Sequence, residues 1–285
     1  MFVIIGILVV LTSVVGGYVL EHGNLGLLFQ PVELLIIGGA ATGAFFISST
    51  PRVFGLVLKN VATVLAPKSQ SKAKYLELLS LLYNLFSKIR KEGLVSIEAD
   101  VESPANSPIF QKSPTVLKDH HVLTFLCDNL KVITTANVPP HELDNLMEIE
   151  IDTHHHQALI PSHAIAKVAD GLPALGIVAA VLGVVLTMAK ISEPPAVLGH
   201  SIGAALVGTF LGVLLSYGIV GPIATNLENQ AEEGSVPFQV VKVALVSFVG
   251  GSAPQMAVEF ARRAVPDKEK PTFDELEQTV RGKVK

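Results

Sequence analysis

Residues 171–189 read GLPALGIVAAVLGVVLTMA, and this stretch decides the fold class of the chain. It has no charged residue and is bounded by Asp170 and Lys190. An uncharged apolar run of about 18 residues or more is long enough to cross a bilayer as a helix. Three further runs meet this criterion: Phe2–Leu20, Leu34–Pro51 and Val197–Val220. The sequence therefore predicts an all-α integral membrane protein with four transmembrane helices.

The composition supports this fold class and excludes several others. The chain has 285 residues, of which 49% are hydrophobic and 16% charged. Soluble proteins carry about a quarter charged residues. A net charge of −4 and the absence of tryptophan disfavour nucleic acid as a partner. The single cysteine, Cys127, excludes a disulfide framework and a cysteine-rich metal site.

The distribution of lysine and arginine predicts the orientation in the membrane. Of the 21 basic residues, 12 lie between Arg52 and Lys167 and 8 lie from Lys242 onward. Basic residues favour the cytoplasmic side. We therefore expect a multi-pass membrane protein with its N-terminus, central loop and C-terminal tail in the cytoplasm. The first span lacks a basic leader region and is expected to be retained.

Four regions follow from this topology. The spans form two hairpins, joined by short turns on the outer side. Transmembrane helices 1–2 occupy residues 1–51, and a cytoplasmic helical domain occupies residues 52–169. Transmembrane helices 3–4 occupy residues 170–222, and cytoplasmic C-terminal helices occupy residues 223–285.

The cytoplasmic regions are predicted to be helical because apolar residues recur three and four positions apart. The predicted elements are a helix through Leu78, Leu79, Leu82, Leu85, Phe86 and Ile89 that ends at Gly93; a loop at Ser103–Pro114; a helix at Val116–Ile133; a helix from Pro139–Pro140 through Leu143, Leu146, Ile149 and Ile151, with a break near Pro161; a buried or interfacial helix at Phe238–Val249; and a last helix at Phe273–Val280.

Small residues line the third and fourth spans at four-residue intervals. The rows are Ala204, Gly208, Gly212 and Ser216; Ser201, Ala205 and Thr209; Gly176 and Ala180; Ala179 and Gly183. Such rows let helix backbones approach closely in lipid. We expect one row to serve the hairpin itself and others to contact another subunit or another helix.

Polar and ionisable side chains are scarce within the predicted spans. None has an ionisable residue near its centre, so no proton relay is predicted from this chain alone. Thr187 and Thr209 would ordinarily bond a carbonyl one turn back. The histidines at 154–156 and His163 lack the spacing of a zinc motif, and we interpret them as surface residues.

Four stretches of the sequence resemble the MotA family of flagellar stator subunits. They are DGLPALGIVAAVLGVV at residues 170–185, ALVGTFLGVL at 205–214 with Pro222 following, QPVELLIIGGA at 30–40, and VEFAR at 258–262. The resemblance covers nearly the whole chain in order. A partial resemblance extends to the ExbB and TolQ families, which share the two ion-lining spans.

The resemblance implies a function that the composition alone does not. Members of this family form a pentamer around two copies of MotB, whose single span supplies the ion-binding aspartate. Thr209 and Ala180 would line the ion path, and Pro173 and Pro222 would couple ion passage to movement. The complex would convert an ion motive force, favoured to be that of protons, into torque on the rotor.

The same resemblance implies a contact with the rotor protein FliG through Arg90 and Glu98. Judged alone, these residues would be assigned to a solvated charged face. No catalytic residue, cofactor or metal is implied.

Two other functions remain open at this point. One is an energy transducer of the ExbB or TolQ type, which has one span before its cytoplasmic part where this chain has two. The other is a membrane-anchored enzyme using the histidines or a Ser/His pair, although no catalytic motif is present.

Overall fold

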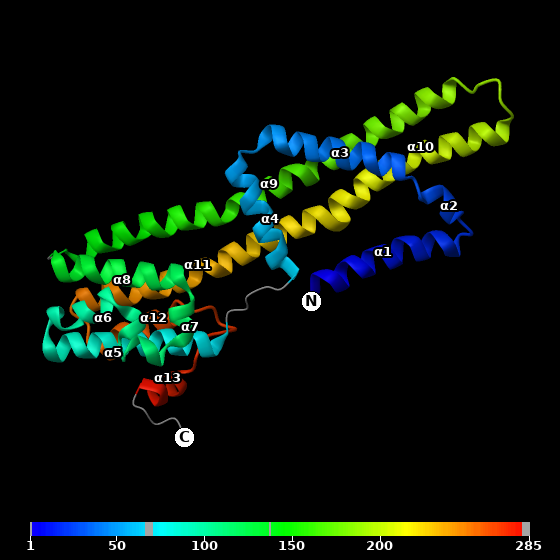
Figure 1. Cartoon of the computed structure of the whole chain (residues 1–285). Coiled ribbons are helices and arrows are strands. Elements are labelled where there is room, and N and C mark those ends of the chain that lie inside the picture. Colours follow the sequence, from blue (N-terminus) through cyan, green and yellow to red (C-terminus); the bar gives the residue numbers. More distant parts are fainter. Residues whose placement is uncertain (1, 66–70, 137, 281–285) are drawn as a thin grey trace. The chain divides into compact units, whose positions relative to one another are not determined.

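The computed structural model describes residues 2–65, 71–136 and 138–280 (Figure 1). The α-helices are α1 (Phe2–Leu20), α2 (Leu25–Leu28), α3 (Pro31–Ser48), α4 (Pro51–Leu65), α5 (Lys72–Glu92), α6 (Glu98–Glu102), α7 (Pro114–Lys118), α8 (His120–Thr135), α9 (Pro140–Met188), α10 (Pro195–Leu215), α11 (Gly221–Val249), α12 (Pro254–Arg263) and α13 (Phe273–Val280). Short 3-10 turns occur at Leu94–Ile97, Pro104–Asn106 and Phe110–Lys112, and a π-helical turn occurs at Ser216–Val220. No strand occurs within these described ranges, so the predicted all-α fold is confirmed.

The chain divides into two compact units. Met1–Lys68 and Ala158–Gln230 form one, which we call the membrane unit. Ser69–Gln157 and Ala231–Lys285 form the other, which we call the helical unit. The long helices α9 and α11 each contribute residues to both units.

Four helical segments are long and apolar enough to cross a membrane, which confirms the predicted number of spans. The first coincides with α1. The second runs over Leu25–Ser48 and so begins before the predicted Leu34. The third lies within α9. The fourth lies within the continuous helical run Pro195–Val249, which begins with α10, and the adjacent courses of α9 and α10 are visible in Figure 1.

Glycines set the distance between α9 and α10 at their crossing. A Cβ atom built on Gly212 would lie 2.6 Å from the Leu172 carbonyl oxygen and 2.9 Å from the Gly176 Cα. A Cβ atom built on Gly176 would lie 2.7 Å from the Gly208 carbonyl oxygen. Real Cβ atoms do not approach backbone this closely, so only glycine fits. The predicted small-residue rows thus pack within the hairpin at these positions.

An amphipathic helix of the membrane unit, α4, was not predicted from the sequence. Val57 and Val64 are buried and pack in one cluster with Ile165, Ala224 and Leu227. Apolar side chains at four- and three-residue steps in α4 carry the signal for this face. The helix follows the second span directly and covers parts of α9 and α11.

The core of the helical unit is built around α5. This helix contacts α7, α12 and α13, and all six of its predicted apolar positions are buried. Phe86 stacks on Phe248 with ring centroids 4.3 Å apart. Gly93 ends the helix as predicted, with φ of 87° and its N–H donated to the Ile89 carbonyl.

Three details of the predicted helices are wrong. Residues 116–133 do not form one helix, because Asp119 caps α8 by accepting a bond from the Val122 N–H. Helix α9 does not break at Pro161, which is a buried residue inside it. Leu146 and Ile149 are exposed, and the buried face of α9 there consists of Leu143, Met147 and Ile151.

Both C-terminal segments predicted to be helical are helical in the structure. Residues 238–249 are helical and largely buried, but they belong to the longer α11. Helix α13 matches the predicted Phe273–Val280.

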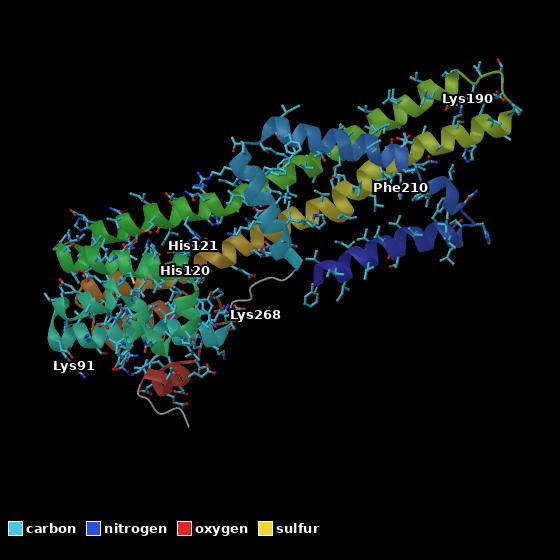
Figure 2. All side chains as sticks on the ribbon, viewed as in Figure 1. Lys91, His120, His121, Lys190, Phe210 and Lys268 are labelled. Atoms are coloured by element: carbon cyan, nitrogen blue, oxygen red, sulfur yellow. The ribbon has the colours of Figure 1, made fainter. Side chains whose placement is uncertain are left out.

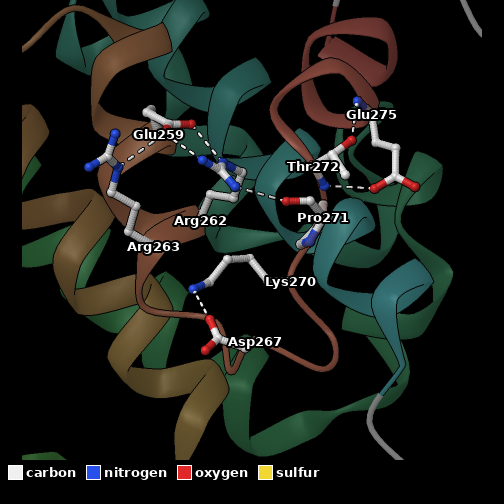
Figure 3. A network of polar contacts seen from close by, with 8 residues as sticks. All are labelled: Glu259, Arg262, Arg263, Asp267, Lys270, Pro271, Thr272 and Glu275. Atoms are coloured by element: carbon white, nitrogen blue, oxygen red, sulfur yellow. Dashed lines mark hydrogen bonds and ion pairs between the residues drawn. The ribbon is translucent and has the colours of Figure 1, made fainter.

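A charged cluster holds the C-terminal part of the helical unit together (Figure 3). Arg262 donates two hydrogen bonds of 2.7 Å to the Glu259 carboxylate and one of 2.9 Å to the Pro271 carbonyl. Arg263 adds a bond of 3.1 Å to Glu259. The hydrogen bond from Arg262 holds the pKa of the Glu259 carboxyl below its ordinary value. Arg262 therefore ties α12 to the segment leading into α13, and the Glu259 carboxylate holds its guanidinium in place.

We expect Gly212→Ala to destabilise the α9–α10 hairpin by about 1–3 kcal/mol, the usual cost of overpacking. The added methyl group would collide with the Leu172 carbonyl oxygen. Gly199→Ala in the same helix is the matched control, since a Cβ atom there meets nothing within 4 Å. Thermal unfolding of the detergent-solubilised protein, followed by circular dichroism, measures the difference. Equal melting temperatures for the two variants would refute the tight crossing.

We expect Glu259→Gln to lower the free energy of unfolding of the helical unit at neutral pH by about 1–3 kcal/mol, the worth of hydrogen bonds to a charged group. Because the folded-state pKa of Glu259 is depressed, this stabilisation is present above the ordinary carboxyl pKa and is lost as the pH falls through the depressed value. The variant should therefore lose less stability in acid than the unmodified chain does. Chemical unfolding at several pH values checks this, with exposed Glu102→Gln as the control.

Candidate ion-path site

The predicted ion-path residues lie at the crossing of α9 and α10. Ala180 is buried, and its backbone nitrogen lies 3.1 Å from a Cβ atom built on Gly208. Thr209 follows Gly208 directly and is half-buried. The fold therefore brings Ala180 next to the segment that carries Thr209.

The two threonines of the third and fourth spans differ. The Thr187 hydroxyl donates a 2.8 Å bond to the Gly183 carbonyl one turn back, as predicted for a threonine in a helix. The Thr209 hydroxyl makes no hydrogen bond within the described part of the chain, so the same prediction is wrong there. A half-buried hydroxyl without a partner is available to a passing ion, a water or another subunit.

The two predicted coupling prolines lie in different surroundings. Pro173 is half-buried inside α9, next to Leu172 at the glycine crossing. Pro222 is exposed in the first turn of α11. Proline has no N–H to donate to the carbonyl four residues back, which weakens the helix locally.

A π-helical turn precedes Pro222. The Gly221 N–H donates to the Ser216 carbonyl, and a Cβ atom built on Gly221 would lie 2.9 Å from that oxygen. Single π turns occur mostly at functional positions in helices. Here the turn lies at the end of the fourth span, between Thr209 and Pro222.

An open cavity of about 640 Å³ lies beside this turn. Its lining includes His163, Asp170, Tyr217, Pro222 and Thr225. Both apolar and polar groups therefore border Pro222 on its exposed side.

Glu33 was not predicted as a site residue, because the second span was taken to begin after it. It lies in the first turn of α3, and its side chain is buried. The prediction missed Glu33 because an uncharged apolar stretch ends, by definition, at the first charged residue, whereas the helix itself includes that residue. A carboxyl three residues into a helix also has an ordinary interpretation at the positive end of the helix dipole.

The two predicted rotor-contact residues are exposed on the helical unit. Arg90 lies in the last turn of α5, and Glu98 begins α6. Neither forms an ion pair within the described residues. Their neighbours Lys88 and Asp100 do pair, at 2.8 Å, and Ser107 donates a 2.6 Å bond to Asp100. This partly buried pair ties α5 to α6, while Arg90 and Glu98 remain exposed.

The prediction of surface histidines holds for His156 and His163, which are exposed, but not for the other two. His154 is half-buried, with its ring 4.4 Å from that of Phe238, and burial lowers its pKa. His155 forms a 3.0 Å hydrogen bond with Ser235. The sequence could not show that α11 covers this side of α9.

A further histidine lies close to His154. The ring of His121, labelled in Figure 2, has its centroid 5.3 Å from that of the His154 ring.

Among the described residues, no three histidine, cysteine or acidic side chains lie close enough to hold an ion together.

Two known families match the chain. Residues 4–93 match the Motility protein A N-terminal family, and residues 117–239 match the MotA/TolQ/ExbB proton channel family. The chain is 43% identical to Motility protein A of Salmonella typhimurium over 282 residues, which cover 99% of this chain and 96% of that protein.

Two solved structures share the fold. The chain resembles the C. jejuni MotAB structure with a TM-score of 0.77 and 18% identity, over 95% of this chain and 98% of that one. It resembles the flagellar MotAB stator complex of Bacillus subtilis with a TM-score of 0.74 and 22% identity, over 93% and 96%. The identity to Motility protein A over almost the full length, together with both family matches, shows that this chain belongs to the Motility protein A family of flagellar stator subunits, within the MotA/TolQ/ExbB proton channel family.

Proposed function

We propose that this stator subunit assembles as a pentamer around a MotB-type dimer and conducts protons along the Thr209 and Ala180 side of α10 and α9. The observation that carries the proposal is the Thr209 hydroxyl, which has no hydrogen-bond partner among the described residues and lies in the helix that carries the glycines of the crossing. The similar solved structures are MotAB complexes, which supports a MotB-type companion. The companion supplies the ion-binding aspartate that the resemblance implies.

Transport can supply enough energy for mechanical work. Each charge that crosses a potential of 100 mV releases about 2.3 kcal/mol. Neutralising the companion's aspartate removes a charge that is costly in the membrane and so changes how its helix fits against Thr209. Pro173 and Pro222 interrupt the helix hydrogen bonding, and we assign to them the transmission of this change to movement.

The membrane orientation follows the basic residues. Lys190 lies in the turn between α9 and α10 (Figure 2), whereas all the other lysines and arginines lie at Arg52–Lys167 or from Lys242 onward. We assign the inner membrane to the spans, with 1–51 and 170–222 as the two hairpins. The regions 52–169 and 223–285, and with them the N-terminus, face the cytoplasm.

A contact with FliG is proposed for Arg90 and Glu98. The two side chains are exposed, have opposite charge and lie outside the Lys88–Asp100 pair. Opposite charges on an exposed surface favour fast, steered encounters over tight binding. That suits a contact that must break and re-form as the rotor turns.

Specific observations rank this function above an ExbB- or TolQ-type transducer. The chain has two spans before its central segment, and it matches the Motility protein A N-terminal family over residues 4–93. An outer-membrane process that fails on deletion, with swimming unaffected, would favour the transducer.

We expect Arg90→Glu and Glu98→Lys to reduce swimming speed severalfold, because each reverses a charge that meets the rotor. Lys268→Glu is the matched control. This exposed lysine belongs to the same unit as Lys91, the neighbour of Arg90, and lies at its other end in Figure 2. Swimming speed and recruitment of fluorescent stators to the motor are measured in a strain lacking the native gene. Normal swimming of both variants would exclude the contact.

We expect rotation to stop when a protonophore collapses the proton gradient and to be insensitive to external sodium. Tethered-cell rotation is recorded while sodium and protonophore are varied separately. A speed that follows sodium and survives the protonophore would show that sodium is the coupling ion.

A further inference from the structure

Glu33 is the acidic side chain that the fold carries into the membrane unit's helix crossing. Helix α3 begins at Pro31, and Glu33 stands in its first turn. A glutamate at this position commonly bonds the backbone at the helix start. Glu33 does not: its Oε2 is buried without a hydrogen-bond partner among the described residues. Helix capping therefore does not account for this carboxyl.

The carboxyl group lies against two glycines of the α9–α10 crossing. Its Oε2 lies 2.9 Å from a Cβ atom built on Gly208, and its Oε1 lies 3.7 Å from one built on Gly183. Only 9% of the residue is exposed. A side chain on either glycine would occupy or crowd the space that the carboxyl now uses. The small-residue row thus makes room for an acid, in addition to letting the helices approach.

The same glycine connects the acid with the proposed ion path. Gly208 precedes Thr209, and the Ala180 nitrogen lies 3.1 Å from the Cβ position on Gly208. Glu33, which is far away in sequence, therefore lies near Ala180 and against the residue that precedes Thr209. An unpaired negative charge costs free energy in such apolar surroundings. A carboxylate there is therefore stabilised by binding a proton or another cation.

We propose that Glu33 is a proton-binding residue of the ion path, contributed by this chain itself. One proton from hydronium on the side of the short turns binds a carboxylate oxygen and leaves water behind. Its release to a water on the Thr209 side restores the carboxylate, and no other bond changes. This inference rests on the proposed function, since it places a second acid in series with that of the companion subunit.

The test uses the full stator complex in a strain that lacks its native subunit. Glu33→Gln keeps the size of the side chain but cannot bind and release a proton. We expect a severalfold lower rotation speed and a flattened dependence on external pH, with normal amounts of complex in the membrane. Glu33→Asp should keep part of the pH response. Glu193→Gln, an exposed acid in the turn between α9 and α10, is the matched control and should behave as the unmodified chain.

The pH profile separates proton binding from a structural role. A merely structural Glu33 would change the amount or speed of the complex without changing the shape of the profile. A Glu33→Gln complex with the speed and pH profile of the unmodified chain would overturn the inference. Failure of the unmodified chain to restore swimming would instead refute the proposed function.

A second measurement needs no variant and decides the matter where Glu33→Gln gives no rotation. An apolar carbodiimide reacts with protonated carboxyl groups in apolar surroundings. Membranes containing the unmodified complex are treated at several pH values, and the modified peptides are identified by mass spectrometry. We expect an adduct on Glu33 that decreases as the pH rises, and none on Glu193. Absence of an adduct on Glu33 at every pH would overturn the inference.

Discussion

The close approach of α9 and α10 is the constraint on which the membrane unit depends. At Gly176, Gly208 and Gly212 the two backbones come so near that no side chain fits between them. In a bilayer, apolar side chains gain little from leaving lipid, so helix association depends on packing of this kind. The crossing also fixes the function-related groups: it brings Ala180 beside the segment bearing Thr209 and leaves room for the Glu33 carboxyl.

The helical unit is held together by different physics. Its core contains large fully buried side chains, such as Phe86, Phe125 and Leu130, which is the usual result of burial from water. The unit also contains ion pairs, among them Lys88 with Asp100 and Arg262 with Glu259. The first pair joins α5 to α6, whereas the second lies within α12, from which Arg262 also reaches the Pro271 carbonyl ahead of α13. The two units of the chain therefore pack differently: small residues line the helix crossing of the membrane unit, and bulky residues fill the core of the helical unit.

Local patterns predicted most of the fold because they depend on neighbours in sequence. The uncharged runs gave the four spans, and the three- and four-residue periodicity gave the buried face of α5. Prediction failed where the outcome depended on distant segments. The burial of His154 requires α11 to cover α9, and that of Glu33 requires α3 to meet the glycine crossing. Pro161 looked like a helix break, but a proline inside a long, packed helix is tolerated.

The π-helical turn at Ser216–Val220 also determines which side of α11 faces α4. A π turn holds one residue more than an α turn, and one residue corresponds to about 100° of rotation around a helix. Ala224 and Leu227 meet α4 with this winding included. If the extra residue were removed, the same two side chains would be directed toward another side, and α4 would lose the packing that α11 supplies. The direction in which Ala224 and Leu227 point from α11 therefore depends on a single residue of backbone winding.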